Sequence, residues 1–318
     1  ALTFMLEHLP PQLHLVVTTR EDPPLPLARY RARGQLTEIR AADLRFTAAE
    51  AAEFLNQMMG LNLSSEEIDA LEARTEGWIA GLQMAAISLQ GRTETTDFVQ
   101  AFTGSHRFVL DFLVEEVLHR QSDGVRSFLL QTSILERLSG PLCDAVTGQS
   151  SSSAMLETLE RDNLFVVPLD DHRRWYRYHH LFGDVLQAHA ADEQPVALST
   201  LHSRASLWYE QNGQPADAIR HALLAADFAR AAHLIELSWR AMDRDFQAAT
   251  WFGWVSALPE ESVRARPVLC VGYAWALLDD GQLDAVEPWL YHAEQWLALS
   301  SATETHREPA VSLSLIHI

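Results

Sequence analysis

Lysine is absent from this 318-residue sequence, and all 24 basic residues are arginine, against 43 acidic residues and a net charge of −19. An acidic balance of this size argues against a surface that wraps nucleic acid, because binding phosphates needs clustered positive charge. Cysteine is nearly absent too: Cys143 and Cys270 are isolated, which excludes a disulfide framework and a paired-cysteine metal site.

Long apolar runs are also missing. No stretch approaches the roughly 18 apolar residues of a membrane span, and no signal peptide is present. These absences predict a cytoplasmic protein with no membrane partner. The hydrophobic content of 47% and charged content of 21% are those of an ordinary globular chain, long enough for two or three domains.

Both ends of the sequence are unusual. The chain begins at Ala1 and enters directly into a periodic helix over residues 2–9. Residues 313–318 are what a transposon mosaic-end sequencing adapter encodes when it is read in frame. We therefore expect an internal fragment of a longer protein, with a disordered tail over 306–318 whose last six residues are an artefact.

The first forty residues contain two short apolar runs typical of buried parallel strands, Leu13 to Thr19 and Leu36 to Ile39. Arg20 follows the first run directly. In open α/β sheets ligands bind beyond the carboxyl ends of strands, so Arg20 could reach a phosphate there. Alternatively, Arg20 is a surface residue that pairs with Glu21 or Asp22.

Helix start signals follow. Thr47 with Glu50, and Ser64 with Glu67, have the spacing of capping boxes, which satisfy two otherwise unpaired N–H groups at a helix start. Gly77 then precedes another helical pattern. A glycine at such a position lets the backbone come close to another helix or to a ligand, and the sequence leaves both readings open.

The middle of the chain has the order helix, helix, helix, hairpin, which is that of a winged-helix domain. The hairpin is predicted from two β-rich runs, 164–169 and 175–179, joined by a polar loop. From His180 the apolar spacing becomes helical. His179 therefore lies where a strand gives way to a helix N-terminus, a place that suits an anion. The alternative is that His179 and His180 form an ordinary polar pair at a strand end.

The third helix of this predicted domain is acidic. It carries Glu157, Glu160 and Asp162 against Arg161. Such a helix would repel the phosphates of DNA. We interpret the winged helix as a packing module that does not read DNA.

After Pro195 the pattern is purely helical. Residues 205–218 resemble residues 273–285: in each, an aromatic-bearing helix ends at Gly-Gln and a second helix opens near Asp-Ala. Gly213 and Gly281 are 68 positions apart, twice the tetratricopeptide period of about 34 residues. Stacked repeats of this kind form a superhelix with a concave groove.

Several of these stretches together resemble the MalT-like, ATP-dependent LuxR-type transcriptional regulators, which belong to the STAND class of P-loop nucleotide switches. The resemblance covers His14 to about Leu299. It is carried by four stretches in the same order: Leu13 to Arg20 with Asp22-Pro23, Leu44 to Thr47, Gly77-Trp78, and Trp175 to His179 with Leu181-Phe182.

The resemblance implies a mainly α fold made of successive domains. These are the C-terminal end of an α/β P-loop NTPase domain (1–42), a helical domain (43–103), a winged-helix domain (104–192), and tetratricopeptide-like helical repeats (193–305).

The resemblance also implies site roles. Arg20 would be a sensor arginine near the γ-phosphate. Gly77, Trp78 and Ile79 would approach the adenine, although related proteins often carry proline where Ile79 stands. His179 would touch the β-phosphate of ADP and hold a closed, resting form. The cofactor is thus ATP or ADP, with Mg²⁺ in the full-length protein.

The implied partners are a small-molecule or protein inducer at the repeats, a second copy of the protein on activation, and DNA through a helix-turn-helix domain outside this chain. The Gly-rich phosphate loop and the acidic Mg²⁺ ligand that the whole protein would use as a slow ATPase switch are also expected outside it. We therefore expect the chain alone to bind and hydrolyse ATP poorly, and we predict no catalytic residue.

Two other functions were weighed. A metal-dependent hydrolase would use His172, His179, His180 and His189 as ligands, but their spacing is not that of a zinc site, and two adjacent histidines cannot both face one metal on a regular element. A tetratricopeptide-type scaffold for protein partners, without nucleotide switching, would explain the last third but not Arg20 and the run before it.

Overall fold

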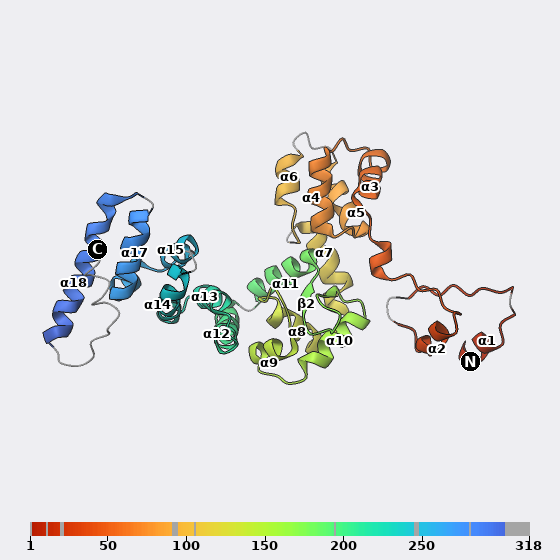
Figure 1. The fold of residues 1–318 in the computed structure, drawn as a ribbon. Coiled ribbons are helices and arrows are strands. Elements are labelled where there is room, and N and C mark those ends of the chain that lie inside the picture. Colours follow the sequence, from red (N-terminus) through yellow and green to blue (C-terminus); the bar gives the residue numbers. More distant parts are fainter. Residues whose placement is uncertain are drawn as a thin grey trace. The chain divides into compact units, whose positions relative to one another are not determined.

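The computed structural model divides the chain into two compact units, Ala1–Glu193 and Gln194–Ile318. Both are mainly helical, and the described residues form a single two-stranded sheet, β1 with β2 (Figure 1). The structure describes residues 2–10, 12–19, 22–90, 95–104, 106–193, 195–244, 248–279 and 281–302.

The first unit begins with short helices: α1 (Leu2–Glu7), α2 (Leu27–Ala32) and the 3-10 helix η1 (Ala41–Leu44). The two strands expected here were wrong. Residues 13–19 and 36–39 have no regular secondary structure. Most of their apolar side chains are exposed, with Val16 at 84% and Ile39 at 69%, and Leu36 is half-buried.

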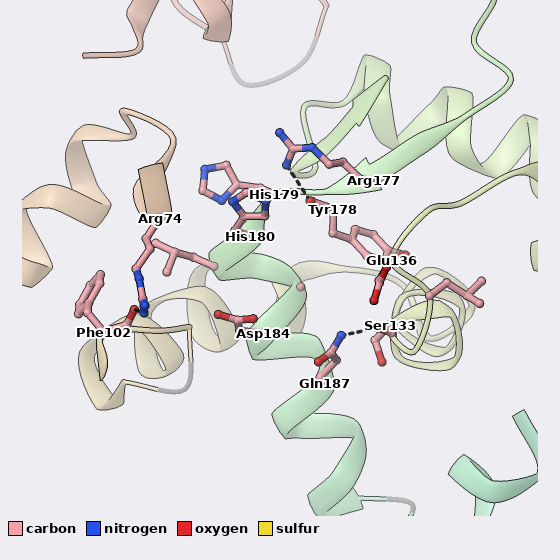
Figure 2. A pocket seen from close by; sticks show the side chains of 13 residues that line it. Arg74, Phe102, Ser133, Glu136, Arg177, Tyr178, His179, His180, Asp184 and Gln187 are labelled. Carbon is pink, nitrogen blue, oxygen red and sulfur yellow. Dashed lines mark hydrogen bonds between the residues drawn. The ribbon is translucent and has the colours of Figure 1, made fainter. Parts of the chain in front are cut away.

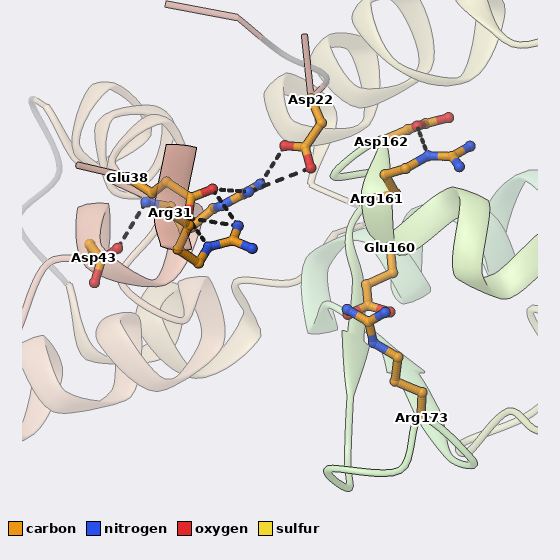
Figure 3. Close-up of polar contacts among 9 residues, drawn as sticks. Asp22, Arg31, Glu38, Asp43, Glu160, Arg161, Asp162 and Arg173 are labelled. Atoms are coloured by element: carbon orange, nitrogen blue, oxygen red, sulfur yellow. Dashed lines mark hydrogen bonds and ion pairs between the residues drawn. The ribbon is translucent and has the colours of Figure 1, made fainter. Parts of the chain in front are cut away.

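A strand is stable only where neighbouring strands satisfy its N–H and C=O groups. Among the described residues, no strand pairs with either run. Ion pairs hold this segment instead (Figure 3): Arg40 contacts Asp22 at 2.5 Å and Glu38 at 2.6 Å, and Arg31 contacts Glu38 at 2.8 Å. These pairs are partly exposed to solvent, so each stabilises the segment only weakly.

The next part of this unit, which we call the helical module, comprises residues 45–104. Both predicted capping boxes are confirmed: Thr47 and Ser64 each accept a bond from the glutamate three residues on. Leu55, Leu71 and Leu82 are completely buried in its core. The helices are α3 (Ala48–Ala52), the π-helix η2 (Glu53–Met58), α4 (Ser65–Thr75), α5 (Ile79–Leu89) and α6 (Thr96–Ala101).

The winged helix follows. Its helices are α7 (Arg107–Glu116), η3 (Leu118–Arg120), α8 (Asp123–Thr132), α9 (Gly140–Thr147), α10 (Ser152–Arg161) and, after the hairpin, α11 (His180–Glu193). The hairpin is confirmed: β1 (Val166–Pro168) pairs antiparallel with β2 (Tyr176–Tyr178). One acid of the acidic helix α10, Glu160, pairs with Arg173 of the hairpin loop at 3.2 Å (Figure 3).

Apart from the turns between helices, the second unit is helical in the residues that the structure describes, as the periodicity predicts. Gly213 and Gly281 both have the positive φ that favours glycine, +69° and +76°, and each follows the first helix of a hairpin. The helices are α12 (Pro195–Gln211), α13 (Pro215–Leu224), α14 (Phe228–Arg244), α15 (Ala248–Ser256), α16 (Glu260–Arg264), α17 (Pro267–Asp279), the 3-10 helix η4 (Leu283–Ala285) and α18 (Val286–Ala302).

A histidine pair joins α12 to α13, in which His221 is buried and His202 is half-buried. His202 Nδ1 lies 2.8 Å from His221 Nδ1, and the His221 ring stacks on Tyr209. Burial lowers the pKa of His202 to about 4 and that of His221 to about 3, with Arg220 adding to both shifts. Both rings are therefore neutral at pH 7, which lets one Nδ1–H donate to the other Nδ1.

We expect this pair to make α12 and α13 acid-sensitive. The unfolded chain binds protons on these histidines below a pH of about 6.5, whereas the folded unit does not, so stability is complete above that pH and falls as the pH decreases towards 4. Hydrogen exchange of residues 199–224 at pH 7 and pH 5 would measure the loss. A His221→Phe variant should lose less on acidification, and an equal loss in both proteins would contradict the assignment.

The described part of the chain contains no helix that is both long enough and apolar enough to cross a bilayer.

Candidate functional site

The junction between β2 and α11 positions His179. The amide of His179 donates to the carbonyl of Phe165 at 2.8 Å, and its carbonyl accepts from the amide of Gly183 at 2.8 Å, as the residue before a helix does. Its side chain points into the unit, since the residue is only 5% exposed. The predicted location of His179 at a change from strand to helix is confirmed.

The imidazole of His179 makes one hydrogen bond. Nε2 lies 2.9 Å from the carbonyl oxygen of Thr75 at the end of α4. A carbonyl only accepts, so Nε2 carries the proton and Nδ1 holds a lone pair. Nδ1 is buried and has no partner in the described structure. Burial lowers the pKa of His179, and the charge of Glu76 and the Thr75 bond offset only part of that shift.

Glu76 supplies the anion at this junction. Its Oε1 and Oε2 accept from Arg177 at 2.6 and 2.9 Å, and Oε1 also accepts from the amide of His180, the first residue of α11, at 3.0 Å. Arg45 approaches Oε2 at 3.3 Å. The sequence predicted that this helix start suits an anion; in the structure a carboxylate of the chain itself occupies it.

The electrostatics of Glu76 follow from these contacts. Burial raises the pKa of this carboxyl, but the hydrogen bonds from Arg177 and from the His180 amide, with the neighbouring positive charge, outweigh burial and lower the pKa to about 2. Glu76 is therefore ionised at neutral pH. With Arg45 and Arg177 it forms a cluster of one negative and two positive charges.

Trp78 lies against the same junction. Its ring centroid is 5.3 Å from that of Phe165 and 6.2 Å from that of His179, both edge-on, and Phe112 lies on another side at 5.9 Å. Ile79, the first residue of α5, is half-buried. The structure thus brings together two of the residues singled out in the sequence, Trp78 and His179.

Gly77 makes its close approach to the backbone of the chain. Its φ is +69°, its carbonyl accepts from the amide of Phe46 at 2.8 Å, and a Cβ built on it would lie 2.3 Å from the Phe46 carbonyl oxygen. Of the two readings that the sequence left open, packing against another segment accounts for this geometry.

Arg20 lies outside the described residues, so its predicted convergence with His179 stays a prediction. The contacts of Glu76 and Arg177 were not anticipated from the sequence. Arg177 stands between Tyr176 and Tyr178, whose side chains are buried, and this alternation signals only that Arg177 faces the other side of the strand.

An open pocket of about 380 Å³ lies between the end of α4, the residues after α8 and the first turns of α11 (Figure 2). Its arginines are already engaged: Arg177 binds Glu76, and Arg74 donates to the Phe102 carbonyl. Asp184 accepts from the amide of Gly104 at 3.0 Å. The lining residues are Arg74, Phe102, Ser133, Leu135, Glu136, Arg177, Tyr178, His179, His180, Leu181, Gly183, Asp184 and Gln187.

A metal centre finds no support in the described residues, which contain no group of three or more His, Cys, Asp or Glu side chains arranged to hold an ion. Of the four histidines weighed as metal ligands, His189 lies 3.1 Å from Glu193, and the side chain of His180 is 60% exposed and lies 3.6 Å from Glu76.

Comparison with known proteins identifies relatives. Residues 114–198 match the family described as the MalT winged helix domain. The chain is 36% identical over 276 residues to the serine/threonine-protein kinase PknK of Mycobacterium tuberculosis, an alignment that covers 87% of the chain and 25% of PknK. It is 32% identical over 309 residues to the HTH-type transcriptional regulator MalT of Klebsiella pneumoniae, covering 96% of the chain and 34% of that regulator.

The regulator of the same name from Vibrio cholerae is 32% identical over 285 residues, which is 86% of the chain and 31% of the relative. The chain therefore spans about a quarter to a third of the length of these relatives. One region is thus shared by proteins named for two different outputs, protein phosphorylation and transcription.

Proposed function

We propose that this chain, a MalT-like region that contains a winged helix of the MalT family, is the switch region of an ATP- and ADP-dependent transcriptional regulator. In this proposal ADP holds a closed, resting form, and nucleotide together with an inducer converts it to a self-associating form that binds DNA. The phosphate loop, the Mg²⁺ ligand and the DNA-binding helix-turn-helix would belong to other parts of the whole protein.

The observation that carries the proposal is the contact between the α4–α5 turn and the β2–α11 junction. The family resemblance gives the adenine to Gly77, Trp78 and Ile79, and the β-phosphate to His179. Trp78 and His179 are in ring contact although about a hundred positions separate them in the sequence. A nucleotide that reached one of them would lie beside the other.

The chemistry of these residues fits a phosphate. His179 has a buried Nδ1 without a partner; once this atom takes up a proton it can donate to a phosphate oxygen, while Nε2–H keeps its bond to the Thr75 carbonyl. The carboxylate of Glu76 would repel an anion, but Arg45 and Arg177 leave the three side chains with one net positive charge. Arg20, which the resemblance places near the γ-phosphate, is proposed to complete the set. ATP or ADP would bring the phosphates; these residues would recognise them.

One histidine cannot operate the switch alone. A charge-assisted hydrogen bond to phosphate contributes roughly 1.5–3 kcal/mol, whereas moving a two-state protein from mostly closed to mostly open needs about 5.5 kcal/mol of differential binding. A second input must therefore add to the nucleotide. We assign it to an inducer, a small molecule or a protein, bound to the helical repeats of the second unit.

The test uses a chimaera in which this chain replaces the matching region of the Klebsiella pneumoniae regulator, to which it aligns over 309 residues. His179→Ala should speed ADP release by about 10- to 100-fold, the effect of losing a hydrogen bond worth roughly 1.5–3 kcal/mol, and should raise transcription without inducer. Release of a fluorescent ADP analogue and a transcriptional reporter measure the two effects.

His172→Ala is the matched control, because His172 lies in the exposed hairpin loop of the same winged helix. It should leave both measurements unchanged. Unchanged ADP release together with unchanged basal transcription in the His179→Ala chimaera would refute the role proposed for His179.

The second candidate, a helical-repeat scaffold without nucleotide switching, draws on the helix hairpins α12/α13 and α17/α18. It gives no role to the buried Nδ1 of His179 or to the charges around it. A chimaera that responds to inducer but is indifferent to nucleotide would favour the scaffold.

A further inference from the structure

The turn between α4 and α5 contacts the winged helix through several residues in a row. The carbonyl of Thr75 accepts from His179, the carboxylate of Glu76 binds Arg177 and the His180 amide, and the Trp78 ring packs on Phe165 and His179. Gly77, between them, is bonded to Phe46 of the helical module. The turn is therefore anchored on one side and holds the β2–α11 junction on the other.

Glu76 is the residue that ties these contacts together. Its backbone has a φ of +49°, which non-glycine residues seldom adopt, and the carboxylate is nearly buried, with 7% of the side chain exposed. In this conformation the carboxylate accepts hydrogen bonds from two segments that are distant in the sequence. Arg45 donates from one of them, and Arg177 and the His180 amide donate from the other. The hydrogen bonds of the Glu76 carboxylate offset the conformational strain of its backbone.

The position of Glu76 also decides what His179 can do. Because Thr75 precedes Glu76 directly, fixing the Glu76 carboxylate fixes the Thr75 carbonyl that accepts the hydrogen bond from Nε2–H. The charged groups that face His179 are Glu76 at the end of α4, Arg45 before α3 and His180 at the start of α11. Of these, only Glu76 favours the protonated ring.

We propose that Glu76 is a positioning residue for His179: it locks the β2–α11 junction so that Nε2–H points at the Thr75 carbonyl, which leaves Nδ1 as the atom that takes up a proton and donates it, in a hydrogen bond, to a bound phosphate. The ligand in this statement rests on the proposed function, but the positioning itself does not. It can be measured in this chain without nucleotide.

The experiment is ¹⁵N NMR of the imidazoles in the chain, with His179 assigned from a His179→Gln variant. In the unsubstituted protein Nε2 should carry the proton and exchange it slowly. In Glu76→Ala the junction is no longer locked: the two neutral tautomers should mix, and the Nε2 proton should exchange about tenfold faster, the effect of weakening one hydrogen bond.

Glu76→Gln separates the effect of the hydrogen bonds at position 76 from the effect of its negative charge. The amide oxygen of glutamine can still accept from Arg177 or the His180 amide, so the tautomer should be kept, while the midpoint of the His179 titration should move to lower pH because a neighbouring negative charge is lost. A purely structural role would not produce this shift in a folded variant. Glu116→Gln is the control. It removes the exposed ion pair between Glu116, the last residue of α7, and Arg120 of η3, and it should change neither the tautomer nor the titration midpoint of His179.

Positioning is refuted if Glu76→Ala leaves the tautomer and the exchange rate of His179 as they were, or if Nδ1 rather than Nε2 carries the proton in the unsubstituted chain. The nucleotide proposal is judged separately by ADP release from the His179→Ala chimaera. If His179→Ala leaves ADP release from the chimaera unchanged while Glu76→Ala changes the tautomer or proton exchange of His179, then Glu76 positions His179 but His179 does not bind the nucleotide.

Discussion

Glu76→Ala is expected to lower the free energy of unfolding of the first unit by about 3 kcal/mol. Removing one partner of a buried ion pair is costly because the other charge stays behind without compensation. Here the guanidinium of Arg177, 25% exposed, would lose both of its bonds to the carboxylate, and the His180 amide would lose its acceptor. Hydrogen exchange measured by mass spectrometry on peptides from 65–89 and 176–193 would report the loss locally.

The contribution of Glu76 to the free energy of unfolding should also depend on pH. Since the folded pKa of Glu76 is lowered to about 2 from an ordinary value near 4.5, its contribution is complete above pH 4.5 and is lost as the pH falls towards 2. The difference between the unsubstituted protein and Glu76→Ala should therefore shrink on acidification. Glu116→Gln should cost about 0.5 kcal/mol or less, as exposed pairs do, and an equal cost at both sites would contradict the special role of Glu76.

Local signals in the sequence predicted local structure well. The capping boxes at Thr47 and Ser64 need only residues three positions away, and both are formed. The hairpin around 166–178 was predicted because two β-rich runs flank a polar loop, and its two strands pair as expected. In these cases the capping bonds and the pairing of the two strands lie within the segment from which they were predicted, although Tyr176 also pairs with Leu138.

The predicted strands at 13–19 and 36–39 failed for the opposite reason. Apolar content identifies a segment that could be buried in a sheet, but the neighbours that would make it a strand come from elsewhere. Among the described residues those neighbours are missing, so Val16 and Ile39 are exposed and the backbone is irregular.

The site shows the same division. His179 could be singled out from its place at a helix start, and Trp78 from the family resemblance. Arg20 was singled out from the run before it, and its own place lies outside the described residues. The bond between Glu76 and Arg177 could not be read from the sequence, because 101 positions separate the two and no periodicity links them. What the sequence offered was a place for an anion; only the fold identifies the anion as Glu76.

The role of Gly77 can be decided by a second substitution with a large expected effect. Gly77→Ala should cost roughly 3 kcal/mol, because alanine at a φ of +69° is strained and its Cβ would lie 2.3 Å from the Phe46 carbonyl oxygen, forcing the backbone apart. Denaturant unfolding of the chain, followed by the exchange of peptides from 45–89, would measure this loss.

Gly60→Ala is the matched control, since Gly60 lies in the same helical module with a φ of +71° and nothing within 4 Å of its added Cβ. Gly60→Ala has the same conformational strain without a clash, so it should lower the free energy of unfolding by about 1 kcal/mol. The difference, about 2 kcal/mol, then measures the approach of Gly77 to Phe46 in the absence of any ligand. If the two variants were equally destabilised, packing would not explain Gly77, and the close approach would have to serve the nucleotide that the resemblance places there.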